Sequence, residues 1–229
     1  MMACSSQATS KSTSDSIEPH SAVSKTMACI GDSITYGHGL DNPSEQSWPA
    51  ILQAKLGDEW HVVNLGVSGT TLTDEGRYPY RSTGNVEQAK KLGADLFIIM
   101  LGTNDASDPQ FDIESYRTQL SALVDELAAS SQAGETVEAG DSSLQPQFVL
   151  MAPPRTFYFL ANDPGADELN RVIGEDIRNA VQSVAAEKGA RYLDLYALTE
   201  QHPEWFPDYL HPNAEGAIAI ADYVFENIS

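Results

Sequence analysis

The sequence predicts an α/β protein in which helices cover both faces of a parallel β-sheet. Five short apolar runs, rich in β-branched residues, are spaced along the chain and separated by longer segments of helical or polar character. Strands that are apolar at nearly every position are typical of a sheet buried on both faces, as parallel sheets with right-handed crossovers are. We therefore predict a three-layer α/β/α sandwich with five parallel strands.

The first part of the chain contains a β-α-β unit. Residues 26–30 form the first predicted strand and residues 61–65 the second, and both are dominated by apolar side chains. Between them, residues 46–56 are predicted to be helical, with Ser44 or Ser47 near the helix start.

The middle of the chain continues this alternation. A predicted helix at residues 85–92 leads into a third strand at 96–101, and a second helix covers residues 113–129. That second helix has an apolar stripe with a 3.6-residue period, which indicates a face turned toward the core. Its members are Tyr116, Leu120, Leu123, Val124 and Leu127.

The last part of the chain completes the predicted sheet. Residues 148–151 and 191–196 form the fourth and fifth strands, with a long helix at 166–188 between them. A closing helix at 214–227 follows. The order of strands and helices fits a single domain over residues 25–229.

Two polar stretches have no strand or helix pattern. Residues 1–24 are rich in Ser, Thr and Lys, so we expect a disordered tail that cannot bury enough apolar surface to fold. Residues 131–146 are aperiodic, and we expect a surface loop insertion there. A tolerated insertion is the simpler interpretation of this loop, and a functional lid is the alternative.

The two cysteines cannot form a disulfide framework. Cys29 lies inside the first apolar strand, where a reduced thiol acts as a small hydrophobe. Cys4 precedes the Ser- and Thr-rich tract and looks like the first residue of a mature bacterial lipoprotein, which would anchor the protein outside the cytoplasm. The alternative is a leader or expression remnant and a cytoplasmic protein, and an apolar segment upstream of Cys4 in the full-length gene would distinguish the two.

The charge balance excludes several kinds of partner. Thirteen basic and 33 acidic residues give a formal net charge of -20, which disfavours nucleic acid, anionic lipid surfaces and polyanionic substrates. No run approaches the roughly 18 apolar residues of a spanning helix, so we expect no integral membrane span. We interpret the acidity as a source of solubility.

Four short polar blocks stand out from the rest of the sequence. They are Gly31-Asp32-Ser33-Ile34-Thr35, Asn64-Leu65-Gly66, Gly102-Thr103-Asn104-Asp105 and Asp208-Tyr209-Leu210-His211-Pro212. The first three follow or overlap predicted strands, and parallel α/β folds place their chemistry at the carboxyl ends of strands. We therefore expect the blocks to converge in space.

Together the blocks contain the groups that acyl transfer through a serine requires. Ser33 follows the first strand at a tight turn, where it can act as a nucleophile or simply cap a helix. Asp208 and His211 are three residues apart, so the carboxylate can orient one imidazole nitrogen while the other faces Ser33. Alone, this spacing also fits a helix cap with a solvated histidine, and the presence of the other blocks favours catalysis.

A developing oxyanion needs preorganised donors, and three are available in the blocks. They are the N–H of Ser33, the N–H of Gly66 and the side-chain amide of Asn104. The competing interpretations are a turn glycine at Gly66 and a turn-stabilising Asx contact at Asn104.

The remaining histidines and motifs are weaker candidates. His202 is the rival base because Glu204 is nearby, whereas His38 and His61 lack a suitable neighbouring acid. The sequence contains no Gly-x-Ser-x-Gly, His-Glu-x-x-His, Cys-x-x-Cys or Gly-x-x-x-x-Gly-Lys motif. We therefore expect neither a metal nor a cofactor.

In this order, the four blocks resemble those of the SGNH, or GDSL, hydrolase family. The resemblance implies a flavodoxin-like sandwich, in agreement with the strand count above, and a serine esterase that works through an acyl-enzyme. It implies Ser33 as the nucleophile, His211 as the base and Asp208 as the acid that orients it. It also implies Gly66 and Asn104 as oxyanion donors.

The loops around the blocks are most similar to the branch of carbohydrate O-acetylesterases acting on acetylated xylan or sialic acid. This similarity implies removal of a short acyl group, acetate in the simplest case, from a sugar hydroxyl. Side chains that could face a sugar, or could equally serve packing, are Tyr36, Tyr80, Arg81, Arg155 and Phe157.

Two alternatives remain open at this stage, along with the oligomeric state. The same triad could serve a lysophospholipase or a thioesterase, which would prefer longer acyl chains. The same sandwich could also be a non-enzymatic binding module, since a fold does not fix function. Against this, Asp32 stands where a flavodoxin needs a hydroxyl-rich phosphate loop, and Tyr196 stands near the position of a receiver domain's lysine.

Overall fold

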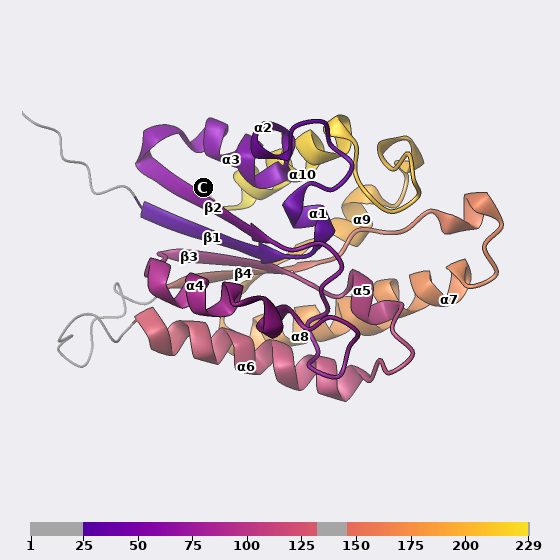
Figure 1. Cartoon of the computed structure of the whole chain (residues 1–229), viewed down its shortest axis with the longest axis horizontal. Coiled ribbons are helices and arrows are strands. Elements are labelled where there is room, and N and C mark those ends of the chain that lie inside the picture. Colours follow the sequence, from indigo (N-terminus) through magenta and orange to yellow (C-terminus); the bar gives the residue numbers. More distant parts are fainter. Residues whose placement is uncertain (1–24, 132–145, 229) are drawn as a thin grey trace, which may run out of the picture.

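The computed structural model describes residues 25–131 and 146–228. The predicted tail at residues 1–24, with Cys4, lies outside the described residues, as does most of the predicted loop at 131–146. The described residues form a five-stranded parallel sheet of strand order β2-β1-β3-β4-β5 between two layers of helices (Figure 1). The predicted three-layer sandwich is therefore confirmed.

The strand register brings the predicted blocks to one edge of the sheet. The strands are β1 (Lys25–Gly31), β2 (Trp60–Gly66), β3 (Leu96–Met100), β4 (Gln147–Ala152) and β5 (Arg191–Asp194). Gly31 at the end of β1 pairs with Gly66 on one side and with Met100 on the other. The carboxyl ends of three neighbouring strands are thus level, and the segments that follow them begin side by side.

The helices divide between the two faces of the sheet, as Figure 1 shows. Helices α3 (Trp48–Leu56) and α10 (Ala214–Ile228) cover one face, and α4 (Asn85–Leu92), α6 (Ile113–Ser131) and α8 (Arg178–Lys188) cover the other. The remaining short helices are α1 (Ser33–Tyr36), α2 (Pro43–Gln46), α5 (Thr103–Ala106), α7 (Ala166–Arg171) and α9 (Leu195–Thr199). Single 3₁₀ turns occur at Gly57–Glu59, Tyr80–Thr83, Tyr158–Ala161 and Pro203–Trp205.

Each face of the sheet packs its own apolar core. The stripe predicted on α6 is buried in the core beneath α4, α6 and α8, so its interpretation as a core-facing surface is confirmed. Cys29 is a buried free thiol in the opposite core, beneath α3 and α10, and burial raises its pKa. Within residues 25–131 and 146–228, no helix is long and apolar enough to cross a membrane.

Two predicted elements begin or end at different residues in the structure. The fifth strand stops at Asp194, because the Asp194 side chain accepts a hydrogen bond from the Ala197 N–H (3.1 Å) and begins α9. The predicted helix at 46–56 is α3, which begins two residues later, at Trp48. Ser47 is extended and precedes it, Pro49 fits its first turn, and Gln46 is the last residue of the separate helix α2.

The predicted helix at 166–188 is continuous but irregular. A π-helical segment, Val172–Ile177, separates α7 from α8. Gly174 lies within this segment, and a Cβ there would come within 2.6 Å of the Tyr196 ring. The absence of a side chain therefore lets the segment pack closely against Tyr196 of α9.

Candidate active site

The nucleophile candidate is held at the turn between β1 and α1. The Asp32 side chain accepts a hydrogen bond from the Ile34 N–H (2.9 Å) and caps α1, of which Ser33 is the first residue. Gly31 permits this tight turn, because a Cβ there would lie 2.1 Å from Thr35 Oγ1. The Ser33 side chain is therefore presented from a fixed backbone at the carboxyl edge of the sheet.

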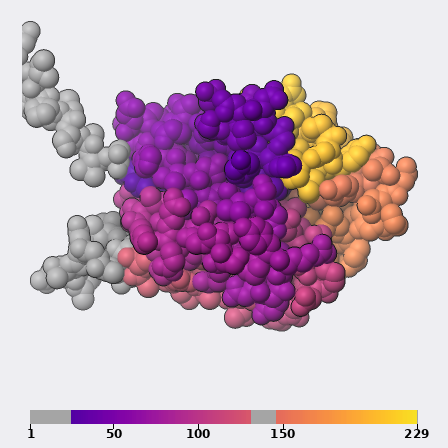
Figure 2. Space-filling model, viewed as in Figure 1, coloured from indigo at the N-terminus to yellow at the C-terminus, as the bar shows by residue number. Residues whose placement is uncertain are grey.

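The base candidate reaches Ser33 from the other end of the chain. His211 Nε2 lies 3.0 Å from Ser33 Oγ, and His211 Nδ1 lies 2.7 Å from Asp208 Oδ2. Figure 2 shows the C-terminal segment, in yellow, against the segment after β1, in indigo. The structure thus brings Asp208, His211 and Ser33 together in the order predicted from the sequence.

The turn that carries His211 is organised by Asp208. Asp208 Oδ1 accepts hydrogen bonds from the Leu210 N–H (3.0 Å) and the His211 N–H (2.7 Å), which leaves Oδ2 to the imidazole. Tyr209 adopts a left-handed conformation with φ 71°, and its carbonyl accepts a hydrogen bond from the Phe157 N–H (2.8 Å). The carboxylate and the imidazole are therefore positioned by one tight, anchored turn.

The electrostatics of this turn favour an ionised Asp208. Partial burial acts to raise the pKa of Asp208, but hydrogen bonds from the His211 N–H, the His211 ring and the Leu210 N–H outweigh burial. The pKa of Asp208 consequently lies below its ordinary value. A carboxylate that stays charged can hold the imidazole and stabilise the imidazolium that forms when His211 takes a proton.

Two buried carboxyl groups, Asp32 and Asp105, lie close to Ser33 in the sequence or in space. Burial, together with the nearby charge of Asp105, raises the pKa of Asp32 to about 7. Asp105 accepts three hydrogen bonds, from the N–H groups of Leu72 and Thr73 and from Thr73 Oγ1, yet burial still raises its pKa. The Asp32 side chain accepts a hydrogen bond from the Ile34 N–H, whereas Asp105 accepts three hydrogen bonds. Since hydrogen bonds to a carboxylate favour its charged form, Asp105 is better suited than Asp32 to carry a negative charge.

The predicted oxyanion donors are not equally available. The Asn104 amide donates one hydrogen bond to the Thr70 carbonyl (3.0 Å) and has a second N–H to offer. The Ser33 N–H has no hydrogen-bond partner among the described residues. The Gly66 N–H, in contrast, already donates to Asn64 Oδ1 (2.9 Å).

Gly66 has a steric role that explains why no side chain stands there. A Cβ on Gly66 would lie 2.3 Å from the Tyr36 backbone nitrogen, so β2 could not approach α1 as it does. Another donor in the same loop was missed at the sequence level: the N–H of Gly69 has no partner among the described residues. Gly69 has φ 82° and open space at its Cβ position, and it precedes Thr70, to which Asn104 is bonded. A second glycine three residues after Gly66 was the sequence signal for it.

Two other histidines, His202 and His38, have defined contacts. His202 pairs with Glu204 (2.8 Å) and stacks on Trp205 at a centroid distance of 3.8 Å, and it has no contact with Ser33 among the described residues. It is therefore not placed to take a proton from Ser33. The His38 ring packs against His211, with centroids 4.5 Å apart and a tilt of 52°.

The five residues proposed to face a sugar fall into two groups. Tyr80 and Phe157 are buried, and Arg81 is bound to Glu126 (2.5 Å), so their roles are structural. Tyr36 is exposed, and the Arg155 guanidinium lies over the Phe159 ring at 5.1 Å. Tyr36 and Arg155 remain candidates for substrate contact.

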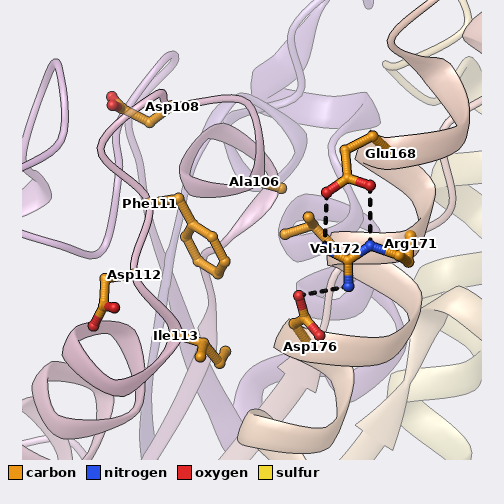
Figure 3. Close-up of a pocket in the computed structure, with 9 residues that line it drawn as sticks. All are labelled: Ala106, Asp108, Phe111, Asp112, Ile113, Glu168, Arg171, Val172 and Asp176. Carbon is orange, nitrogen blue, oxygen red and sulfur yellow. Dashed lines mark hydrogen bonds and ion pairs between the residues drawn. The ribbon is translucent and has the colours of Figure 1, made fainter.

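A cavity of about 460 Å³ lies beside the end of α5, between the residues that follow α5 and the residues of α7 and the π-helical segment (Figure 3). It is lined by Ala106, Asp108, Phe111, Asp112, Ile113, Glu168, Arg171, Val172 and Asp176, and by no triad residue. In residues 25–131 and 146–228, this cavity included, no three His, Cys, Asp or Glu side chains are arranged to hold a metal ion. The expectation of a metal-free site stays a prediction.

The fold and the site together define an α/β protein with a serine, histidine and aspartate relay at the carboxyl edge of its sheet. This chain belongs to the GDSL-like lipase/acylhydrolase family, whose model matches residues 29–218. An acetylxylan esterase from Xylanibacter ruminicola is 32% identical over 205 residues, which are 86% of this chain and 42% of that protein. The chain thus spans less than half the length of this relative.

Solved structures share the fold along most of the chain. A carbohydrate acetylesterase from Sinorhizobium meliloti matches with a TM-score of 0.68 and 23% identity, covering 89% of this chain and 98% of that one. The M. smegmatis aryl esterase matches with a TM-score of 0.69 and 20% identity, covering 90% and 98%. At these identities the likeness shows the common fold.

Proposed function

We propose that this chain is a serine carboxyl-ester hydrolase that removes acetyl groups from carbohydrate hydroxyls. The observation that carries the proposal is the contact of Ser33 Oγ with His211 Nε2 at 3.0 Å, with Asp208 on the other ring nitrogen. An acetylxylan esterase among the relatives and a carbohydrate acetylesterase of the same fold support the choice of substrate.

The chemistry follows from the roles of the three side chains. Ser33 Oγ attacks the ester carbonyl while His211 Nε2 takes its proton, and Asp208 stabilises the imidazolium. His211 then gives the proton to the departing sugar oxygen, which leaves an acetyl group on Ser33. His211 takes a proton from water as the water attacks that ester, and then gives the proton to Ser33 Oγ as this oxygen leaves, so that acetate is released and both side chains return to their starting states.

The oxyanion formed in each step needs hydrogen-bond donors that are not otherwise engaged. The Ser33 N–H and the second N–H of the Asn104 amide meet this condition, and we assign the third donor to the Gly69 N–H. Each such donor contributes about 3 to 4 kcal/mol to the barrier reduction in serine hydrolases. Gly66 is a weaker candidate than Gly69, because the Gly66 N–H already donates a hydrogen bond to Asn64 Oδ1.

The decisive experiment replaces the nucleophile. Ser33→Ala should lower kcat on p-nitrophenyl acetate by at least about 10³-fold, because the acyl-enzyme can no longer form. Ser183→Ala on the exposed side of α8 is the matched control and should keep full activity. If Ser33→Ala folds normally and retains more than a tenth of the activity, the assignment is wrong.

A series of ester chain lengths tests the acyl group. We expect kcat/KM to be highest for p-nitrophenyl acetate and to fall from butyrate to octanoate. A second assay should then detect acetate release from acetylated xylan. A rising series would instead favour a lysophospholipase or thioesterase on the same triad.

A further inference from the structure

The cavity beyond α5 is close to the proposed catalytic groups but separate from them. Ala106, which lines it, is the last residue of α5, and α5 also carries Asn104. Gly102, which precedes α5, would meet Ile177 of the π-helical segment at 3.0 Å if it carried a Cβ. One short helix therefore joins the oxyanion side of the site to the wall of the cavity.

The cavity has an apolar floor and a charged rim. Ala106, Phe111, Ile113 and Val172 supply the floor, and in Figure 3 the Phe111 ring points into the space facing Val172. The charged residues of the rim are Asp108, Asp112, Glu168, Arg171 and Asp176. The volume of the cavity, about 460 Å³, lies within the range of small-molecule sites, about 300 to 1,000 Å³.

The polar groups on one side of the rim are held in a fixed arrangement. Arg171 donates to both oxygens of Glu168 (3.0 and 2.8 Å) and to Asp176 (2.9 Å), as the dashed lines in Figure 3 mark. Three of the five guanidinium N–H groups are used in this way, so two remain for a ligand. The carboxylate oxygens keep acceptor capacity as well.

The backbone at this wall is also unusual. Arg171 ends α7, and Val172 and Asp176 belong to the π-helical segment Val172–Ile177. Single π-helical turns are rare and occur frequently at functional sites. Here the wide turn places Val172 on the floor of the cavity and Asp176 on its rim.

The lining selects among ligand classes. Four carboxylates against one guanidinium disfavour an anion, and the charged rim disfavours a long acyl chain. A neutral, hydroxyl-rich molecule fits both halves of the cavity. Its C–H face can lie on Phe111, and its hydroxyls can donate to the carboxylates and accept from Arg171.

We propose that this cavity is a carbohydrate subsite, which binds sugar units next to the acetylated one. The inference rests on the proposed function, and it adds that the protein acts on oligomeric rather than monomeric sugars. A longer chain would then gain binding energy from the cavity while its ester lies at Ser33.

The test compares substrate length in the wild type and in variants of the cavity. In the wild type, kcat/KM should rise from acetylated xylose to acetylated xylotetraose. Phe111→Ala should flatten this rise by about threefold to tenfold, the worth of one aromatic contact. Arg171→Ala should flatten it by about tenfold or more, the worth of a hydrogen bond to a charged group. Activity on p-nitrophenyl acetate should stay within about twofold of the wild type, because neither residue contacts the triad.

Arg117→Ala is the matched control. Arg117 is paired with Glu187 and is as exposed as Arg171, with side-chain exposures of 43% and 44%, but it does not line the cavity. If Phe111→Ala fails to fold, the exposed Arg171→Ala still decides the question. A chain-length dependence that both variants leave intact overturns the subsite. Hydrolysis of p-nitrophenyl acetate with none of any acetylated sugar instead overturns the carbohydrate part of the proposed function, and the subsite with it.

Discussion

Tyr209 shows how much local conformation the triad requires. A non-glycine residue in the left-handed region costs on the order of 1 kcal/mol or more and persists only where its surroundings hold it. Here Phe157, from the loop after β4, donates to the Tyr209 carbonyl, and Tyr209 donates its own N–H to Phe206. The strained turn is what allows one carboxylate to bind two backbone N–H groups and the His211 ring.

His38 is expected to orient the catalytic imidazole. The His38 ring packs on the His211 ring, and the backbone N–H of His38 donates a hydrogen bond to the Ser33 carbonyl (2.9 Å). His38→Ala should lower kcat on p-nitrophenyl acetate by on the order of tenfold, because a base that is slightly misplaced loses much of its effect. His38→Phe keeps an aromatic face and should stay within about twofold.

The matched control for this prediction is His61→Ala, since His61 is an exposed histidine on the edge strand β2. Equal kcat values for His38→Ala and the wild type would show that the ring contact has no role in orienting His211.

Asp32 should make the fold less stable as the pH rises. The pKa of Asp32 in the fold is about 7, above its ordinary value, mainly because of burial. The folded state therefore binds this proton more tightly than the unfolded chain, so the stabilisation is complete at low pH and is lost as the pH rises through about 7. The slope is at most about 1.4 kcal/mol per pH unit.

Asp32→Asn removes this titration and can still accept from the Ile34 N–H. Urea unfolding from pH 5 to 8 should show a smaller loss of stability in the variant than in the wild type. Asp58→Asn, at an exposed carboxylate, is the control and should follow the wild type. Parallel curves for Asp32→Asn and the wild type would contradict the raised pKa.

At the scale of elements, the contact of β2 with α1 depends on Gly66. Gly66→Ala should lower the free energy of unfolding by about 1 to 3 kcal/mol, because its Cβ would overlap the α1 backbone. Gly165→Ala is the control, since its φ is -89° and its nearest contact is the flexible Asp163 side chain at 3.3 Å. The measurement is chemical unfolding of both variants.

This variant also separates the two roles considered for Gly66. Alanine keeps the backbone N–H, so a well-folded Gly66→Ala with normal stability and much reduced activity would restore Gly66 as a residue close to the substrate. Lower stability with unchanged kcat per folded molecule would support the steric role.

The elements that the sequence predicts well are those with a strong apolar pattern. All five strands and the helices at 85–92, 113–129 and 214–227 depend on runs or stripes that only a buried position explains. The details that differ have local causes that a hydrophobic pattern does not contain. A side-chain cap ends β5 at Asp194, the extended Ser47 delays the start of α3, and the Tyr196 ring packs against the π-helical segment.

The same contrast applies to the site. The meeting of Ser33, Asp208 and His211 could be predicted because their spacing and order fit the contacts that acyl transfer requires, whereas their roles stay a prediction. The choice between Gly66 and Gly69 as donors could not be made, since it depends on which N–H the Asn64 side chain binds. That is a property of the folded loop and leaves little trace in a single sequence.

At the scale of the whole molecule, the net charge of -20 should oppose folding through self-repulsion. Most ion pairs among the described residues have at least one exposed partner, so they offset little of this repulsion. Salt shortens the range of the repulsion from about 10 Å at 0.1 M to about 3 Å at 1 M.

Raising the NaCl concentration from about 0.05 M to about 1 M should therefore raise Tm. The expected gain is about 2 to 4 °C for each 1 kcal/mol of unfolding free energy regained at this chain length. A variant with Asp58→Asn and Glu59→Gln, two exposed neighbours between α3 and β2 without an ion pair among the described residues, should start at a higher Tm and gain less from salt. A Tm that is flat or falls with salt in both proteins would mean that the surface ion pairs matter more than the net charge. In that case the acidity would serve solubility alone, without a cost in stability.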